Sequence, residues 1–171
     1  MGAVDVYLDA IKRADDNLRR AVEELTVEEL RNQPAGPGSN PIGWLVWHMT
    51  RTRDNIVASV TGKQSIWERE GWGAKFGMEG QPPRFVPEDV HTFDPKSFDT
   101  LMGYFEAVAT QTGQDVEALA DDEMGRMIEP TVPGRPAQPV SARLGVILND
   151  NIQHVGQVAY LRGLIRGQGW F

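Results

Sequence analysis

The side chains in this sequence that are best suited to bind a metal ion or move a proton are three histidines. They are His48, His91 and His154, and the chain contains no cysteine. The absence of cysteine excludes disulfides, zinc–thiolate sites, iron–sulfur clusters and a cysteine nucleophile. Any metal ion bound by this chain must therefore be held by imidazoles and carboxylates.

One of these histidines lies four residues after an acid. On a helix, Asp150 and His154 would lie on the same face, one turn apart. Ile147 and Val158 belong to that face too, so the acid and the imidazole are expected in apolar surroundings, where each costs free energy unless it is paired or coordinated. The spacing is compatible with an ion pair within one helix and with two ligands of a metal site.

His48 stands in the middle of a second apolar stripe, between Leu45 and Ile56. If the two segments face each other, His48, Asp150 and His154 converge on one point of the interior. Two imidazoles and one carboxylate leave positions open on a divalent ion, as catalytic sites do. Zinc, nickel, iron and manganese all suit such a ligand set.

A purely structural role for these residues is the alternative. Asp150 and His154 could form only an ion pair, and His48 could be a core histidine that is hydrogen-bonded to Asn55 or Asn151. The residue pattern alone favours neither the metal nor the structural interpretation.

Polar residues near these positions are candidates for orienting a substrate. Asn55 and Asn151 share faces with the candidate ligands. Arg51 lies near the face of His48, where it could hold an anionic ligand or simply be solvated. Asp54 lies about 120° around the helix from His48 and is predicted to be a surface charge.

Four helices must position these residues, because apolar residues recur every three or four positions along four long segments. Pro41 and Pro95 are expected in the first turns of two of them, where a missing N–H costs little. Thr26 and Glu29 predict a capping box at the start of a short additional helix. The long helices are expected over residues 4–25, 41–60, 95–119 and 141–166.

Residues 63–94 mix Gly, Pro, Trp and Phe without a helical period. A connection of about 30 residues is usually functional or a crossover. It contains His91, a further candidate ligand. Its aromatic residues could form a lid over the open end of the bundle, but we expect most of them to pack the loop onto the helices; they are Trp67, Trp72, Phe76, Phe85 and Phe93.

These elements predict an all-α fold in a single domain that spans residues 1–171. The first and last connections are short enough to join antiparallel neighbours. The middle connection can carry the chain along the whole bundle, so the second and third helices would run parallel. We therefore expect a four-helix bundle with up-down-down-up topology and a long irregular loop between helices two and three.

The composition argues against several kinds of partner. Acids outnumber Lys and Arg by 24 to 17, and the net charge of −7 argues against binding to nucleic acid. No segment has the apolar length of a membrane span, and the N-terminus lacks the basic start and apolar run of a secretory signal. The expected location is therefore the cytoplasm.

Two segments resemble a known family. NPIGWLVWHM, which contains His48, and D-x3-HVGQVAYLRGLIRGQGW, which contains Asp150 and His154, are similar to the DinB/YfiT-like superfamily of metal-binding four-helix bundles. Members typically place one ligand histidine on helix two and an H-x3-H pair on helix four. His48 and His154 match that pattern, whereas position 150 is Asp. The related mycothiol-dependent maleylpyruvate isomerases use an acidic residue there.

The resemblance implies a divalent metal ion held by His48, Asp150 and His154, with Arg51, Asn55 or Asn151 orienting the substrate. It also implies a thiol-dependent S-transferase or isomerase, in which a small thiol such as mycothiol attacks an electrophilic substrate. The alternative is a non-catalytic, stress-associated protein that binds a metal or small ligand at a degenerate site. A homodimer is a further expectation.

Overall fold

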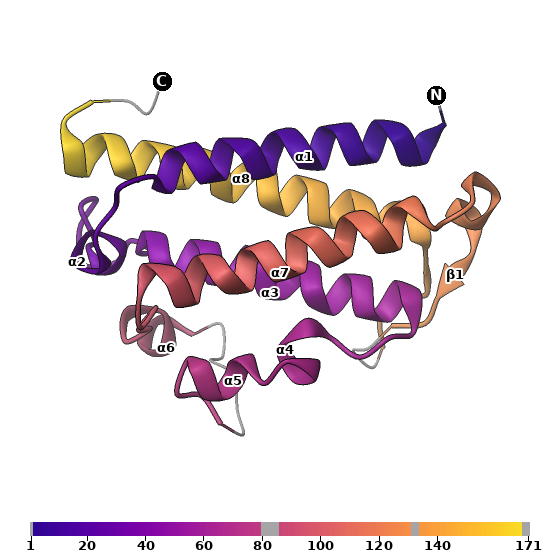
Figure 1. The fold of residues 1–171 in the computed structure, drawn as a ribbon, viewed down its shortest axis with the longest axis horizontal. Coiled ribbons are helices and arrows are strands. Elements are labelled where there is room, and N and C mark those ends of the chain that lie inside the picture. Colours follow the sequence, from indigo (N-terminus) through magenta and orange to yellow (C-terminus); the bar gives the residue numbers. More distant parts are fainter. Residues whose placement is uncertain (1, 80–85, 131–133, 169–171) are drawn as a thin grey trace.

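A bundle of four long helices forms the body of the computed structural model, which describes residues 2–79, 86–130 and 134–168. The helices are α1 (Ala3–Val22), α3 (Ile42–Thr61), α7 (Phe98–Glu117) and α8 (Val140–Arg166). In Figure 1, α1 and α8 run from right to left, whereas α3 and α7 run from left to right. The predicted all-α bundle with up-down-down-up topology is therefore confirmed.

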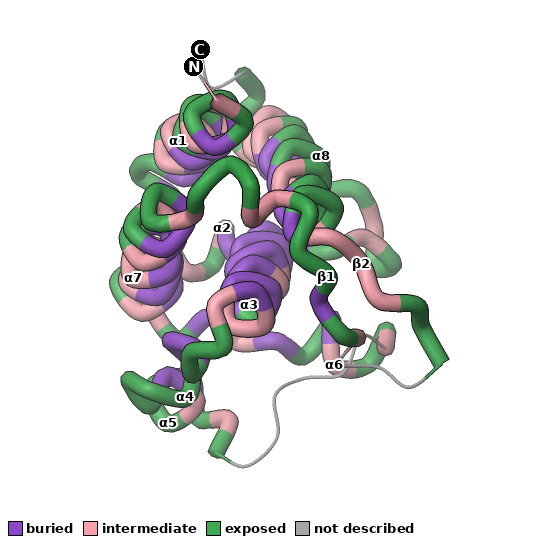
Figure 2. Tube along the Cα trace, turned by 90° about the vertical axis from the view of Figure 1, so that its right-hand side faces the viewer, coloured by how far each residue is buried: buried purple, intermediate pink, exposed green. Residues whose placement is uncertain are grey.

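Short elements connect the long helices. They are α2 (Val27–Arg31), α4 (Ile66–Arg69), α5 (Trp72–Lys75), α6 (Pro87–His91), the 3-10 helix η1 (Asp121–Gly125), and the antiparallel strands β1 (Met127–Ile128) and β2 (Gln138–Pro139). The connection expected to be irregular over residues 63–94 thus contains three short helices. Figure 2 looks along the bundle and shows α4 and α5 outside α3 and α7, with the β1–β2 hairpin on the side of α8.

Local side-chain chemistry sets where the helices begin. The capping box before α2 is confirmed, because the Glu29 N–H donates to Thr26 Oγ1 and the Thr26 N–H donates to Glu29 Oε2. The expectation that Pro95 lies in the first turn of the third long helix is wrong. Lys96 has a φ of 64°, which no helix can pass through, and Ser97 caps α7 by accepting a hydrogen bond from the Thr100 N–H.

An aromatic cluster packs the middle connection onto α3. The Trp47 ring lies 6.0 Å from that of Trp67 and 5.4 Å from that of Phe93. Trp72 and Phe76 are buried beside them. The packing interpretation of these aromatics is therefore confirmed, and none of these four forms a lid; Phe85 lies outside the described residues.

Asp54, predicted to be a surface charge, is only 3% exposed, so that prediction is wrong. Its carboxylate accepts hydrogen bonds from the backbone N–H groups of Ile66 and Trp67, at 2.8 and 2.9 Å, and from the Tyr104 hydroxyl at 2.8 Å. The acid thus caps the first turn of α4 and ties it to α3 and α7.

None of the helices that the structure describes combines the length and the apolar composition that a membrane span requires.

Candidate metal centre

Three side chains from two neighbouring helices meet at one edge of the bundle. Asp150 Oδ1 lies 3.6 Å from His48 Nε2 and 3.4 Å from His154 Nε2. The two imidazole rings are 4.9 Å apart and almost perpendicular. The antiparallel packing of α3 against α8 produces this meeting, because it places the second turn of α3 beside the middle of α8.

The group lies at the rim of the interior rather than deep within it. Its side chains are 17–21% exposed, whereas their neighbour Asn151 is almost completely buried. His48 and His154 face a cleft of about 320 Å³. The cleft is lined by Gly38, Asn40, Trp44, His48, Val86, Pro87, Val90, His91 and His154.

The electrostatics of the group favour a cation. Burial alone would raise the pKa of the Asp150 carboxyl, but the neighbouring imidazoles of His154 and His48 outweigh it and hold that pKa well below its ordinary range. Burial alone would lower the pKa of the His154 imidazole, but the Asp150 carboxylate and the hydrogen bond with Gln157 outweigh it, so that this pKa is raised. Asp150 is therefore ionised at neutral pH.

Gln157 orients one of the imidazoles. Its Oε1 lies 2.7 Å from His154 Nδ1. When Nδ1–H donates this bond, the lone pair of Nε2 faces Asp150, and such a partner on the second nitrogen is typical of metal-bound histidines. Sequence analysis overlooked Gln157, although its position three residues after His154 on one helix was a usable signal.

The geometry of the three residues fits a divalent ion. Two ligands of a tetrahedral ion with bonds of about 2.1 Å lie about 3.4 Å apart, close to the two separations between the acid and the imidazoles. All three ligand atoms lie within 4.8 Å of one another, so small side-chain rotations would bring them onto one ion. Asp150 Oδ2 is buried and has no hydrogen-bond partner among the described residues, a need that a cation would meet.

The predicted substrate-binding residues lie elsewhere in the structure. Arg51 donates a 2.6 Å hydrogen bond to Asn55 and stacks over the Trp67 ring, 5.1 Å from its centre. Asn151 is 1% exposed and donates to the Ile147 carbonyl. The described lining of the cleft contains none of these three residues. Their role in orienting a substrate stays a prediction.

The cleft contains residues that sequence analysis did not connect with the site. Asn40 and Trp44 line it, and the Trp44 ring stacks beside His48 with an angle of 22° between the planes. His91 also lines the cleft but does not belong to the three-residue group. Only the fold of the α2–α3 turn brings Asn40 to the cleft, so no local spacing indicated it.

Comparisons with known proteins agree with this fold. The profile of the DinB superfamily matches residues 10–158. A conserved protein from Enterococcus faecalis has a TM-score of 0.86 at 21% identity, with 98% of this chain and 99% of that chain covered. A DinB-like protein from Bacillus cereus has a TM-score of 0.62 at 19% identity, with 94% and 91% covered. No curated protein matches the sequence.

At these identities the two solved structures support the fold alone. The profile match supports membership of the family, because it covers most of the sequence, including His48, Asp150 and His154. The chain belongs to the DinB superfamily.

Proposed function

We propose that the protein binds one divalent metal ion through His48 Nε2, the Asp150 carboxylate and His154 Nε2, and transfers or isomerises a small electrophile with the help of a thiol cosubstrate. The observation that supports the metal site is the meeting of these three groups from α3 and α8 within 4.8 Å. The thiol chemistry is supported by the resemblance of the two ligand-bearing segments to thiol-dependent relatives.

The protein's own residues prepare the site in three ways. Asp150 supplies a negative charge that is already ionised at neutral pH, and Gln157 turns Nε2 of His154 inward. Trp44 and Val90 provide apolar walls for a ligand in the cleft. A bound ion would lower the pKa of a coordinated thiol. Because the chain has no cysteine, the thiol must come from a cosubstrate.

Metal content is the first test. The untagged protein should contain about one divalent ion per chain, and His48→Ala and His154→Ala should lose it. His91→Ala is the matched control, because this histidine lines the same cleft outside the ligand group. A chelator should lower the melting temperature of the wild type and leave the two ligand variants unchanged. Metal content that is equal in all four proteins would contradict the proposal.

Thiol transfer is the second test. The metal-loaded protein should accelerate conjugation of a low-molecular-weight thiol to a small electrophile, and His154→Ala should abolish the acceleration. Retention of the metal without acceleration by any thiol offered would instead support the non-catalytic alternative.

A further inference from the structure

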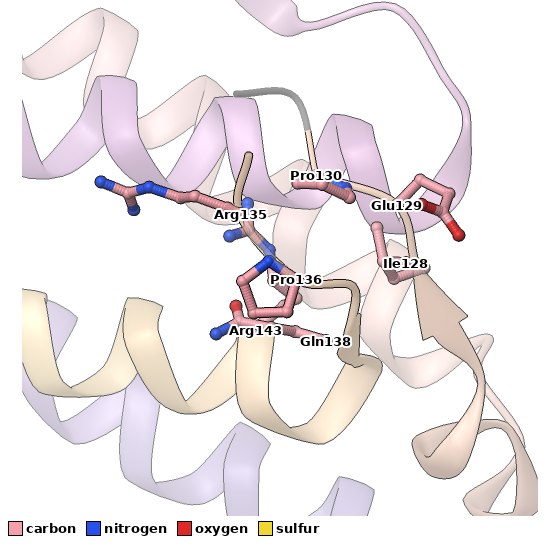
Figure 3. Close-up of a pocket in the computed structure, with 7 residues that line it drawn as sticks. All are labelled: Ile128, Glu129, Pro130, Arg135, Pro136, Gln138 and Arg143. Atoms are coloured by element: carbon pink, nitrogen blue, oxygen red, sulfur yellow. The ribbon is translucent and has the colours of Figure 1, made fainter. Parts of the chain in front are cut away.

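A second pocket lies outside the candidate metal centre, between the β1–β2 hairpin and the first turn of α8 (Figure 3). It has a volume of about 80 Å³. Arg135, Gln138 and Arg143 provide its hydrogen-bond donors, and Glu129 and apolar groups complete the lining. The proposed function gives these residues no role.

The two arginines differ from every other basic side chain that the structure describes. Each of the others has an ion pair, a hydrogen bond or an aromatic contact. Within the described ranges, Arg135 and Arg143 have no such interaction, although acids outnumber bases in the chain. Nε of Arg143 is buried without a partner. Arg143 is half-buried and Arg135 is exposed. A buried N–H donor without an acceptor costs free energy, and an anion at Arg143 would supply that acceptor.

The acid in this pocket does not neutralise them. Glu129 forms no ion pair with any basic residue that the structure describes, and Figure 3 shows its carboxylate on the opposite side of the pocket from the Arg135 guanidinium. Arg135, Arg143 and Gln138 therefore line the pocket with side-chain donors that no described acid uses.

We propose that this pocket binds the oxyanionic group of a small ligand, a carboxylate or a phosphate. Guanidinium groups present paired donors that match both oxyanions. A volume of about 80 Å³ holds two or three water-sized groups at about 30 Å³ each. The pocket therefore has room for one such group.

The position of Arg143 connects the pocket with the metal centre, and this step rests on the proposed function. Arg143, Asp150 and His154 lie on one face of α8, at offsets of seven and eleven residues. The first offset corresponds to about 10 Å along the helix axis. The pocket would thus hold the anionic end of an elongated substrate or thiol whose reactive end reaches the metal centre.

The pocket is tested on the metal-free full chain, with the chelator removed because it is itself a polycarboxylate. The 15N-labelled protein is titrated at constant ionic strength with acetate, inorganic phosphate and, as a neutral control, acetamide. The Arg Nε–H and Gln138 amide signals should shift saturably with at least one anion and not with acetamide. Arg135→Gln and Arg143→Gln should each raise the Kd about tenfold or more. Arg13→Gln on α1, which removes the same charge, should leave it unchanged.

If Arg143→Gln does not fold, Arg135→Gln keeps the test valid, because Arg135 is exposed and its replacement should leave the fold intact. The absence of saturable shifts, or an equal Kd in both variants and the wild type, would overturn the pocket. His154→Ala should bind the anion normally, so failure of the metal centre is distinguished from failure of the pocket.

The connection to the metal centre has its own test on zinc-loaded protein. Among mercaptoalkanoic acids of increasing chain length, affinity should rise until the spacer covers about 10 Å. Arg143→Gln should remove that rise. Affinity that is independent of chain length would overturn the connection and leave the anion pocket to be judged by the first experiment.

Discussion

Each imidazole of the candidate metal centre needs a defined ring orientation before it can offer a lone pair to an ion. His154 obtains it from the hydrogen bond between Nδ1 and Gln157, and His48 lies between the Trp44 ring and the edge of His154. Asp150 replaces the histidine that the superfamily pattern places at this position, and it lies close enough to both imidazoles to share an ion with them. At this scale the site depends on residues beside the ligands as much as on the ligands.

Replacing Gln157 by alanine tests that dependence. Loss of the bond to His154 Nδ1 should weaken metal binding about 10–100-fold, because the ring is no longer held in its ligating orientation. Competition with a chromophoric chelator measures the affinity. Gln153→Ala is the matched control, since Gln153 is exposed on the same helix and bonds only Asn149 among the described residues. Equal losses in the two variants would show that Gln157 does not position the ligand.

At the scale of elements, the middle connection is held to the bundle by buried polar and aromatic groups. Asp54 of α3 accepts hydrogen bonds from the backbone N–H groups at the start of α4, and Trp67 of α4 packs on Trp47. These contacts hold the middle connection against α3, the helix that also carries His48. The connection is therefore part of the scaffold of the site.

Asp54→Ala should lower the free energy of unfolding by about 2–4 kcal/mol, because it leaves two backbone donors and the Tyr104 hydroxyl without their charged acceptor. Tyr104→Phe removes one of the three bonds and should cost about 1 kcal/mol. Urea denaturation measures both. A change below about 0.5 kcal/mol for Asp54→Ala, as is common for surface positions, would contradict the role assigned to this acid.

Asp94 links α2 to the turn before α7 and makes stability depend on pH. Burial alone would raise its pKa, but hydrogen bonds from Arg31 and from the backbone and side chain of Lys96 outweigh this and lower it to about 2. A carboxyl whose pKa is lowered by folding stabilises the fold at pH values above its ordinary pKa. This contribution disappears as the pH falls through the pKa that the carboxyl has in the folded state.

Asp94→Asn should therefore reduce the free energy of unfolding at neutral pH by less than about 1 kcal/mol, because the side chain is partly exposed. The difference from the wild type should shrink between about pH 4 and pH 2. Urea denaturation across this range measures it, with Asp99→Asn as the exposed control on α7. A difference that is constant down to pH 2 would show that Asp94 is not stabilised as an anion.

At the scale of the whole molecule, helix periodicity was sufficient to predict the four long helices, and the lengths of their connections were sufficient to predict the topology. Periodicity placed His48 on one apolar stripe and Asp150 and His154 on another, and the packing of α3 against α8 brings the three together. It failed for Asp54, whose burial depends on a connection that folds back from 12 residues later in the chain. It likewise gave no account of Arg51, which stacks over the ring of Trp67 from the middle connection. Contacts between distant segments are invisible to a periodic pattern.

One such contact ties three of the four helices together. Arg53 of α3 is buried, and it donates to Asp15 of α1 at 2.7 Å and to Thr112 of α7 at 3.0 Å. A buried ion pair of this kind costs desolvation of both charges, so it stabilises the bundle little relative to apolar packing. Removing one partner alone, however, leaves the other charge buried and unpaired.

Arg53→Met should therefore destabilise the protein by about 3–5 kcal/mol, and Asp15→Leu by a similar amount. The double variant should recover most of the loss, because it replaces both charges by apolar side chains of similar length that can pack between α1, α3 and α7. Urea denaturation of the three variants forms the double-mutant cycle. If the two losses simply add, the pair is not coupled, and the three helices are held by their apolar stripes alone. Metal content serves as the check on the site: it should be unchanged in the double variant, since α1 supplies none of the candidate ligands and the α3–α8 contact that brings them together does not include Asp15.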